Sequence, residues 1–380
     1  MLNPEERIIE VLRHNRVDFL SSLPCDRIKS LLERMKKAFF PVPLTREEEG
    51  VGISAGIALA GKRPAMFVQS SGVGNMINAL LSLTGFYELP LALFISHRGI
   101  YKEGIAAQVP MGKRLPGILK GAGIAYAAIS TVDDIRTIEK KLPLVYDKNR
   151  IQAFLLSPAV FEEVCDSAAI SPPSCPVRSS TVKDSAKELK PLMSRYDMIR
   201  EIAPLLDGKV IVCNLGIPSK ELYALKHQPS NFYMLGSMGM ATPIGLGISL
   251  ASNREVVVID GDGSILMNPG TLATAAHLNP SNLTIIAVDN SSYGSTGGQP
   301  TLTGSCVDLA ALAQGFGIGT VIRAAGKKQL RDALRERAPK LKFIHALALP
   351  GNAKVPNIPL DHMENKRQVM AFIRGAQGFD

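Results

Sequence analysis

The chain has 380 residues and a formal net charge of +9, and 46% of its residues are hydrophobic. This length predicts two domains more readily than one, and the hydrophobic content suffices for a large core in each. This charge could suit nucleic acid, but the basic residues are dispersed, with no basic tract interleaved with aromatics. A small anionic substrate fits the charge at least as well, and plain solubility is the simplest alternative. The N-terminus is charged and amphipathic, with no continuous apolar h-region, and no apolar run approaches the length of a membrane span. We therefore expect a cytoplasmic protein that contacts no membrane.

The cysteines exclude two further classes of protein. They number five, are scattered along the chain and never form a C-x-x-C pair: Cys25, Cys165, Cys175, Cys213 and Cys306. An odd and irregular set argues against a disulfide framework and against a zinc site, so we expect free, buried thiols.

Short apolar runs alternate with helical patterns through the first half of the chain. Strands are predicted at Pro64–Gln69, 90–96, Ala125–Ile129 and Ile151–Leu156. Helices are predicted at 5–14, 24–37, Glu47–Leu59 and 132–142, with another after Ser70–Asn75, and a polar loop is predicted at 97–112. This alternation is typical of a parallel sheet that helices cover on both faces.

The alternation stops at 167–190, which is rich in Ser, Pro and Lys, and then resumes. Strands are predicted at Val210–Cys213, 232–235, 320–323 and 342–349 and in the runs VVVID and LTIIAVD, and helices at 219–226, 241–250, 307–316, 329–338 and 365–374. We therefore predict an α/β fold with two tandem, doubly wound parallel-sheet domains, 1–166 and 191–380, joined by a linker at 167–190.

Two polar residues follow apolar strands of the second predicted domain. Asp262 lies in the turn Gly261-Asp262-Gly263-Ser264 after VVVID, and Asn290 follows LTIIAVD. Open α/β sheets bind ligands at the carboxyl ends of their strands, and glycines let the backbone approach a phosphate. Because carboxylate, amide and phosphate oxygens together suit a hard cation, this corner predicts Mg²⁺ beside a phosphate group.

The same residues could also serve in an ordinary turn, a calcium loop or a dinucleotide site. Asp-Gly and Asn-Ser are common in ordinary turns. The alternation of Asp260, Asp262 and Ser264 is similar to a calcium loop, but Thr271 occupies the position of the bidentate Glu and no helix enters the loop. A dinucleotide fingerprint is disfavoured because the GLG that starts at Gly245 lies inside a predicted helix.

The GDGS turn, the helix and strand after it, and the segment DN-SSYG together resemble the fingerprint of thiamine diphosphate (ThDP) enzymes. The resemblance implies that Mg²⁺ is bound by Asp262, Asn290 and the Ser292 carbonyl. It also implies that the diphosphate is bound by Gly261, Gly263 and Ser264. The family usually has Asn where this chain has Asp289, but the implied metal ligand is the next residue.

A ThDP enzyme also needs a carboxylate for the aminopyrimidine ring. The segment EEEGVGISAG resembles the helix start that carries this group in the pyrimidine-binding (PYR) domain, and its offset selects Glu47 over Glu48 and Glu49. The alternative is that three glutamates simply suit a helix N-terminus.

The same resemblance places a wedge beneath the thiazolium ring. Gly236, Ser237, Met238 and Gly239 match the family's G-S-x-G segment, which implies that Gly236 and Ser237 contact the cofactor and that Met238 is the wedge. A buried core methionine is the alternative.

The loop QSSGVGN resembles QNSGLGN of the phosphonopyruvate and sulfopyruvate decarboxylases. It implies that Ser71 and Asn75 lie over the cofactor, although an ordinary strand-to-helix turn would have the same pattern. A PYR domain followed directly by a diphosphate-binding (PP) domain also fits this group. The stretches SHRGIYKEGIAAQVPMG and PGNAKVPNIPLDH resemble the sulfopyruvate branch, whose α and β subunits would here be fused.

This resemblance implies a carboxy-lyase that converts 3-sulfopyruvate to sulfoacetaldehyde and CO₂, a step of coenzyme M synthesis in a methanogen. The sulfonate needs cations, which one loop supplies: His97, Arg98, Lys102, Lys113 and Arg114. Arg98 and His97 are the first choices, because an Arg can hold such an anion with two parallel hydrogen bonds. His97 could instead be the proton donor, and a solvated basic loop is the alternative to both.

Three competing functions remain possible on the sequence. Phosphonopyruvate decarboxylation would share the mechanism, but Ser70 replaces the Asn of QNSG. A non-catalytic ThDP-binding regulator would have less need of Glu47, and a nucleic-acid binder is supported by net charge alone. Since the family binds its cofactor between a PYR domain of one chain and a PP domain of another, the resemblance implies a homodimer or homotetramer.

Overall fold

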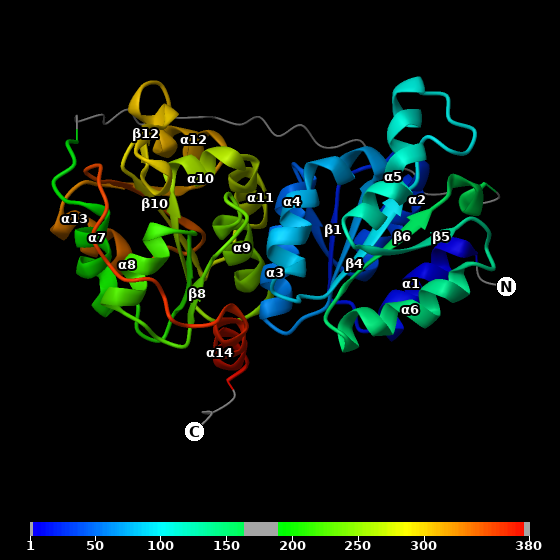
Figure 1. Cartoon of the computed structure of the whole chain (residues 1–380), viewed down its shortest axis with the longest axis horizontal. Coiled ribbons are helices and arrows are strands. Elements are labelled where there is room, and N and C mark those ends of the chain that lie inside the picture. Colours follow the sequence, from blue (N-terminus) through cyan, green and yellow to red (C-terminus); the bar gives the residue numbers. More distant parts are fainter. Residues whose placement is uncertain (1–2, 163–188, 376–380) are drawn as a thin grey trace. The chain divides into compact units, whose positions relative to one another are not determined.

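The computed structural model describes residues 3–162 and 189–375, which fold into two compact units, each built almost entirely from one of these ranges. The predicted linker 167–190 lies outside the described residues except for its last two. Each unit is an α/β layer structure with helices on the faces of its sheet (Figure 1).

Six parallel strands form the sheet of the first unit, in the order β2-β1-β3-β4-β6-β5. They are β1 (Phe19–Ser22), β2 (Phe40–Pro43), β3 (Pro64–Gln69), β4 (Leu91–Ser96), β5 (Ala125–Ile129) and β6 (Ile151–Leu156). The central strands β3 and β4 are almost wholly buried, as expected for strands covered on both faces. Phe67, Phe94 and Phe154 pair in register across β3, β4 and β6, and their rings stack at 4.5 and 4.9 Å.

One helix of this unit precedes β1, and the others connect successive strands. They are α1 (Pro4–His14), α2 (Lys29–Ala38), α3 (Glu47–Leu59), α4 (Ile77–Ala79), which continues as a π-helical turn at Leu80–Gly85, α5 (Val109–Gly121) and α6 (Ile135–Asp147). A 3₁₀ segment at Ser70–Asn75 links β3 to α4. Three acidic residues occupy the first turn of α3, where the helix dipole favours negative charge.

The sheet of the second unit also has six parallel strands, in the order β13-β14-β10-β9-β7-β8. They are β7 (Val210–Cys213), β8 (Asn231–Tyr233), β9 (Val256–Gly261), β10 (Leu283–Asp289), β13 (Thr320–Ala324) and β14 (Lys342–Leu347). A short antiparallel hairpin, β11 (Ser292–Tyr293) with β12 (Gln299–Pro300), follows β10.

The helices of the second unit are α7 (Arg195–Ile202), α8 (Ile217–Leu225), α9 (Ala241–Ala251), α10 (Asp262–Met267), α11 (Gly270–Leu278), α12 (Leu309–Gly315), α13 (Lys327–Arg335) and α14 (His362–Arg374). Gly245 lets α9 pack closely on β9, because a Cβ atom there would overlap the side chain of Val258. This close contact is the reason for a glycine in the interior of a helix, and it agrees with the predicted helix at 241–250.

The two sheets have one topology. When β7, β8, β9, β10, β13 and β14 are numbered 1 to 6, the second sheet read from its β8 edge is 2-1-3-4-6-5, the order of the first sheet. The prediction of two similar tandem α/β units is therefore confirmed. In this order the chain leaves strands 1 and 3 in opposite directions along the sheet, so the crevice between β7 and β9 is a topological switch point where ligands bind.

Several elements differ from the sequence prediction. The strands β1 and β2 were not predicted, because FLSS and FPVP are short and β2 contains two prolines. The helix α5 was also missed, and it begins at Val109, before the predicted end of the polar loop. Pro110 is tolerated there because it lies in the first turn, where its missing N–H has no helical partner.

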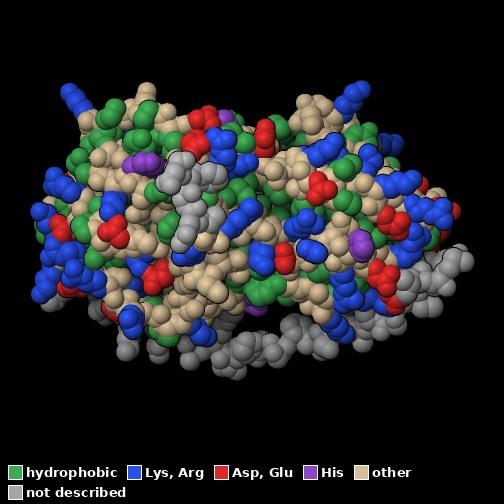
Figure 2. Space-filling view, turned by 90° about the horizontal axis from the view of Figure 1, so that it is seen from below, with side chains coloured by type: hydrophobic (Ala, Val, Ile, Leu, Met, Phe, Trp, Pro, Cys, Tyr) green, Lys and Arg blue, Asp and Glu red, His purple; other side chains and the backbone are tan. Residues whose placement is uncertain are grey.

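Lys and Arg side chains are interspersed with Asp and Glu over most of the face drawn in Figure 2. Among residues 3–162 and 189–375, none of the helices combines the length and apolarity that a membrane crossing requires.

Candidate functional site

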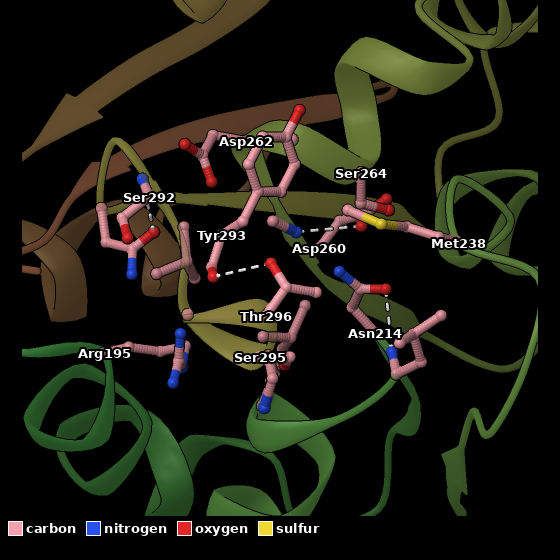
Figure 3. Close-up of a pocket in the computed structure, with 18 residues that line it drawn as sticks. Arg195, Asn214, Met238, Asp260, Asp262, Ser264, Ser292, Tyr293, Ser295 and Thr296 are labelled. Carbon is pink, nitrogen blue, oxygen red and sulfur yellow. Dashed lines mark hydrogen bonds between the residues drawn. The ribbon is translucent and has the colours of Figure 1, made fainter. Parts of the chain in front are cut away.

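A pocket opens at the carboxyl ends of β7, β9 and β10 in the second unit (Figure 3). Gly261 of β9 pairs in register with Val288 of β10, so both strands end at the same level. The residues that follow these strands, Asp262 and Asn290, therefore both line the pocket.

The pocket gathers most of the residues that the GDGS and DN-SSYG motifs selected. Its lining includes Gly261, Asp262, Gly263, Ser264, Asn290, Ser292 and Met238. Gly263 lies against Tyr293, since a Cβ atom there would overlap the tyrosine ring. Only glycine thus allows the GDGS turn and the SSYG segment to approach this closely.

Asp260 does not belong to this ligand set. Its carboxylate accepts hydrogen bonds from the backbone N–H and the hydroxyl of Thr242, the latter at 2.7 Å, at the start of α9. Burial raises the pKa of Asp260, and these hydrogen bonds oppose the shift. The side chain therefore anchors α9 to β9, which removes the calcium-loop alternative for Asp260, Asp262 and Ser264.

Asp262 accepts from two threonine hydroxyls and shares one of them, that of Thr303, with Asp289. Thr301 and Thr303 both contact Asp262 Oδ2, the latter at 3.0 Å, while Thr303 Oγ1 also lies 2.7 Å from Asp289 Oδ1. The two hydroxyls lie 2.9 Å apart. They carry one proton each, so two protons serve four contacts and the cluster has an excess of acceptors.

The electrostatics of this cluster favour a cation. Burial, together with the charge of Asp289, raises the pKa of Asp262. Burial alone would raise the pKa of Asp289 too, but hydrogen bonds from His345 and Thr303 lower it overall. His345 Nε2 lies 2.9 Å from Asp289 Oδ2. A cation beside Asp262 would relieve both the repulsion and the shortage of donors.

Asn290 is also incompletely satisfied. Its Oδ1 accepts from the backbone N–H of Ser292 at 3.3 Å, while its buried Nδ2 has no hydrogen-bond partner. A buried amide without a partner is costly, so a bound group with oxygen atoms would fit here. Among the described residues no cluster of three or more His, Cys, Asp and Glu could hold a metal. A metal at this position would therefore rely on Asp262 with amide and carbonyl oxygens, which suits Mg²⁺ rather than Zn²⁺.

The turn at 236–239 brings Met238 to the pocket. Ser237 has a left-handed backbone with φ of 59°, and Gly239 has φ of 90° and donates its N–H to Ser264 Oγ at 3.1 Å. A non-glycine residue held in this region is strained, and such strain often marks a functional site. Met238 is half-buried and lines the pocket, whereas Met240 is the methionine that belongs to the core.

In the first unit, Glu47 lies against the 3₁₀ segment Ser70–Asn75. Its side chain is buried, and Oε2 accepts from Asn75 Nδ2 at 3.0 Å. A Cβ atom on Gly72 would overlap the Glu47 carboxylate, so this glycine is required for the contact. The helix start and the QSSGVGN loop, which the sequence selected separately, are thus in direct contact.

The two neighbouring glutamates have different contacts. Glu49 accepts hydrogen bonds from the backbone N–H and the hydroxyl of Thr45, the latter at 2.8 Å, at the N-terminus of α3. Glu48 lies 4.0 Å from Arg46. Glu49 therefore supports the helix start, and among these three glutamates Glu47 is the one held by the loop.

The strongest ion pairs of the loop after β4 are those of Arg98. Arg98 is buried and forms a two-pronged ion pair with Glu103, at 2.6 and 2.7 Å, and another ion pair with Asp26. The hydrogen bonds between Arg98 and Glu103 raise the pKa of Arg98 and lower that of Glu103 to about 2. A substrate anion would have to compete with these carboxylates for the Arg98 guanidinium.

The other predicted cations, Lys102 in this loop and Lys113 and Arg114 in α5, differ in their partners. The side chain of Lys102 is paired with Glu162. The side chain of Lys113 has no hydrogen bond or ion pair within the described parts of the chain. Arg114 contacts only the Pro110 carbonyl, at 3.3 Å. Of the named lysines, Lys113 is therefore the one free to meet an anion.

His97 is buried, and its Nε2 lies 2.9 Å from the carbonyl of Gly112. Burial lowers the pKa of His97, and the hydrogen bond to this carbonyl opposes the shift. The imidazole is therefore neutral at pH 7, with its Nε2 proton held by the backbone. This proton is not available to a substrate while the hydrogen bond persists.

Sequence reasoning missed several residues that the fold brings to the site. Asn214 and Leu215, which follow β7, line the pocket. Arg195, Tyr293 and Ser295 line it from other elements. Thr301, Thr303 and His345 surround Asp262 and Asp289. The position of Asn214 after an apolar strand, like that of Asn290, was the available signal for the first of these.

Comparisons with known proteins place the chain in a family. Residues 3–110 match the model of the N-terminal TPP binding domain of thiamine pyrophosphate enzymes, and residues 218–346 match that of the C-terminal TPP binding domain. The sulfopyruvate decarboxylase of Methanosarcina acetivorans is 44% identical over 371 residues, which cover 96% of each chain. The sulfopyruvate decarboxylase subunit beta of Methanothermobacter thermautotrophicus is 46% identical and covers 49% of this chain and 98% of its own.

More distant relatives agree with this placement. The phosphonopyruvate decarboxylase of Streptomyces viridochromogenes is 32% identical and covers 84% of this chain and 81% of its own. A thiamine diphosphate-dependent 4-hydroxybenzoylformate decarboxylase of Rhodococcus jostii RHA1 has the same fold, with a TM-score of 0.71, 15% identity and coverage of 92% and 99%. The prediction of tandem PYR and PP domains without a middle domain is confirmed, as is the fusion of α-like and β-like halves. The chain belongs to the sulfopyruvate decarboxylase family of thiamine pyrophosphate enzymes.

Proposed function

We propose that this protein decarboxylates 3-sulfopyruvate to sulfoacetaldehyde and CO₂, with thiamine diphosphate and Mg²⁺ as cofactors. The observation that carries the proposal is the 44% identity to a sulfopyruvate decarboxylase over 96% of both chains. The phosphonopyruvate decarboxylase relative is 32% identical and matches less of the chain, so the sulfonated substrate is preferred. In a methanogen this reaction would serve coenzyme M synthesis.

The proposed cofactor ligands lie in the second unit. Asp262, Asn290 and the Ser292 carbonyl would hold Mg²⁺, while Gly263 and Ser264 would meet the diphosphate with backbone N–H groups. The excess of acceptors around Asp262 supports a cation, and the unpaired amide N–H of Asn290 supports a bound group with oxygen atoms beside it. Gly236 and Ser237 would shape the turn that presents Met238 to the thiazolium ring.

The bound cofactor supplies a carbon nucleophile and an electron sink for the departing CO₂. Glu47 would hold a proton toward the aminopyrimidine ring, and its contact with Asn75 would fix the orientation of its carboxylate. Asn75 and Ser71, on the exposed side of the 3₁₀ segment, would cover the reacting groups. Because Glu47 is buried, water is excluded from its carboxylate, and its proton would pass to the cofactor rather than to solvent.

We assign the sulfonate first to Lys113, which has no partner in the described residues and follows the Gly112 that His97 contacts. The start of α5 also packs near the 3₁₀ segment Ser70–Asn75, since Met111 Cε lies 3.9 Å from a Cβ atom placed on Gly74. Arg98 and Lys102 would contribute charge while their carboxylate partners hold the loop. His97 would act by positioning α5 through Gly112.

The domain boundaries 1–166 and 191–380 and the linker 167–190 remain part of this proposal. We also propose a homodimer or homotetramer, because relatives exist as separate α and β subunits that must associate to join their halves. The competing function is phosphonopyruvate decarboxylation, in which a dianionic phosphonate would replace the sulfonate.

An assay of the wild-type chain on sulfopyruvate, phosphonopyruvate and pyruvate tests the proposal directly. We expect CO₂ release to be fastest with sulfopyruvate and to require both ThDP and Mg²⁺, because neither cofactor's chemistry can be supplied by side chains alone. Faster turnover of phosphonopyruvate would support the competing function. Turnover that is independent of ThDP would reject both.

The substitution Glu47→Gln should lower kcat on sulfopyruvate by about 10²–10⁴-fold, because it removes the proton-transferring group without changing its shape. ThDP binding and the melting temperature should stay close to wild type. Glu48→Gln is the matched control and should retain activity within about twofold. Comparable kcat in Glu47→Gln and wild type would remove Glu47 from the catalytic role.

The substitution Lys113→Ala should raise KM for sulfopyruvate by at least about tenfold, since it removes a charge-assisted contact with the sulfonate. KM for pyruvate, which lacks this group, should change by less than about twofold. Lys120→Ala removes the same charge from the same helix at an exposed position, and as the control it should leave KM for sulfopyruvate within about twofold of wild type. If steady-state kinetics give equal changes for both substrates, Lys113 does not bind the anion.

A further inference from the structure

The segment 292–296 carries one proposed Mg²⁺ ligand and lines the pocket with Tyr293, Gly294, Ser295 and Thr296. It belongs to no strand of the main sheet, since its only strand pairing is the short hairpin with β12. Because such a segment has little regular structure of its own, its position must come from the side chains that contact it.

One of these contacts comes from a residue that is distant in sequence. Asn352, in the segment between β14 and α14, donates from Nδ2 to the Gly294 carbonyl at 2.7 Å. A Cβ atom on Gly294 would lie 2.6 Å from Asn352 Oδ1, so glycine is needed for this approach. Asn352 is far from Gly294 in sequence but fixes its backbone directly.

Asn352 is itself held by a buried ion pair. Its Oδ1 accepts from Arg195 Nη2 at 2.9 Å, and Arg195 donates from Nε and Nη2 to Glu221 at 2.7 and 3.1 Å. Glu221 Oε1 also accepts from the backbone N–H of Ala353 at 3.0 Å. Both charged side chains are more than nine-tenths buried, and a buried pair of this geometry is rigid because breaking it leaves an uncompensated charge.

The opposite side of the same segment rests on α8. Ser295 Oγ accepts from the backbone N–H of Ile217 at 3.4 Å, and a Cβ atom on Gly216 would lie 2.6 Å from this oxygen. Gly216 has φ of 80°, a conformation that glycine adopts without strain. Segment 292–296 is thus held between the start of α8 and the Asn352 contact.

We propose that Asn352, held by Arg195 and Glu221, is a positioning residue that sets the affinity for Mg²⁺ and ThDP by fixing segment 292–296. The inference rests on the proposed function, because the bound groups are those assigned above. None of the three side chains needs to touch the substrate. Their effect is to keep the Ser292 carbonyl and the pocket wall in place before binding, which reduces the ordering cost of the complex.

Calorimetric titration of ThDP, in the presence of Mg²⁺, into the full-length wild type and variants tests this inference. Asn352→Ala should weaken ThDP binding by about three- to tenfold, as expected for one hydrogen bond with an uncharged group. Asn352→Asp keeps the acceptor for Arg195 but loses the donor to Gly294, and it should weaken binding at least as much. At saturating ThDP, kcat should stay within about twofold of wild type for both, since the residues touch no reacting atom.

The matched control is Asn357→Ala, in the same segment, because Asn357 is exposed and has no partner among the described residues. Its ThDP affinity should equal that of wild type. Equal affinity of Asn352→Ala and wild type would overturn the inference while leaving the proposed function intact. Wild type that binds no ThDP would instead reject the proposed function. Melting of the cofactor-free proteins separates loss of affinity from loss of fold.

Discussion

The site depends on an excess of hydrogen-bond acceptors at the ends of β9 and β10. Asp262 and Asp289 approach the same hydroxyl of Thr303, and two hydroxyl protons serve four contacts. His345 Nε2 lies 2.9 Å from Asp289, whereas Asp262 has no basic side chain among these contacts. A bound cation would stabilise an arrangement of this kind, and the neighbouring amide and carbonyl oxygens favour a hard cation.

The repeated sheet order explains where such a site can form. Both units have the order 2-1-3-4-6-5, so each has a switch point between its first and third strands. In the second unit this crevice lies between Asn214 and the GDGS turn, where the proposed diphosphate ligands are. In the first unit the strand ends carry the segment that contacts Glu47. One architecture thus supports two different chemical roles through its loops.

The sequence predicted the parts of this structure whose signals are local. The apolar runs of β9 and β10, the helix at Glu47–Leu59 and the GDGS turn each depend on a few adjacent residues. Thr301, Thr303 and His345 were missed, because only tertiary folding brings them to Asp262 and Asp289. Arg98 was predicted as a ligand since its charge is visible in the sequence, but its engagement by Glu103 and Asp26 is visible only in the structure.

The proposed site requires Asp262 as a ligand of Mg²⁺, and an isosteric substitution at this position tests that role. Asp262→Asn keeps the side-chain shape and the contacts with Thr301 and Thr303 but removes the charge. In calorimetric titrations of ThDP with Mg²⁺, we expect wild type to bind and Asp262→Asn to bind at least about 100-fold more weakly, as loss of a buried charge at a metal predicts. Equal Mg²⁺-dependent binding of ThDP by the two proteins would contradict this role.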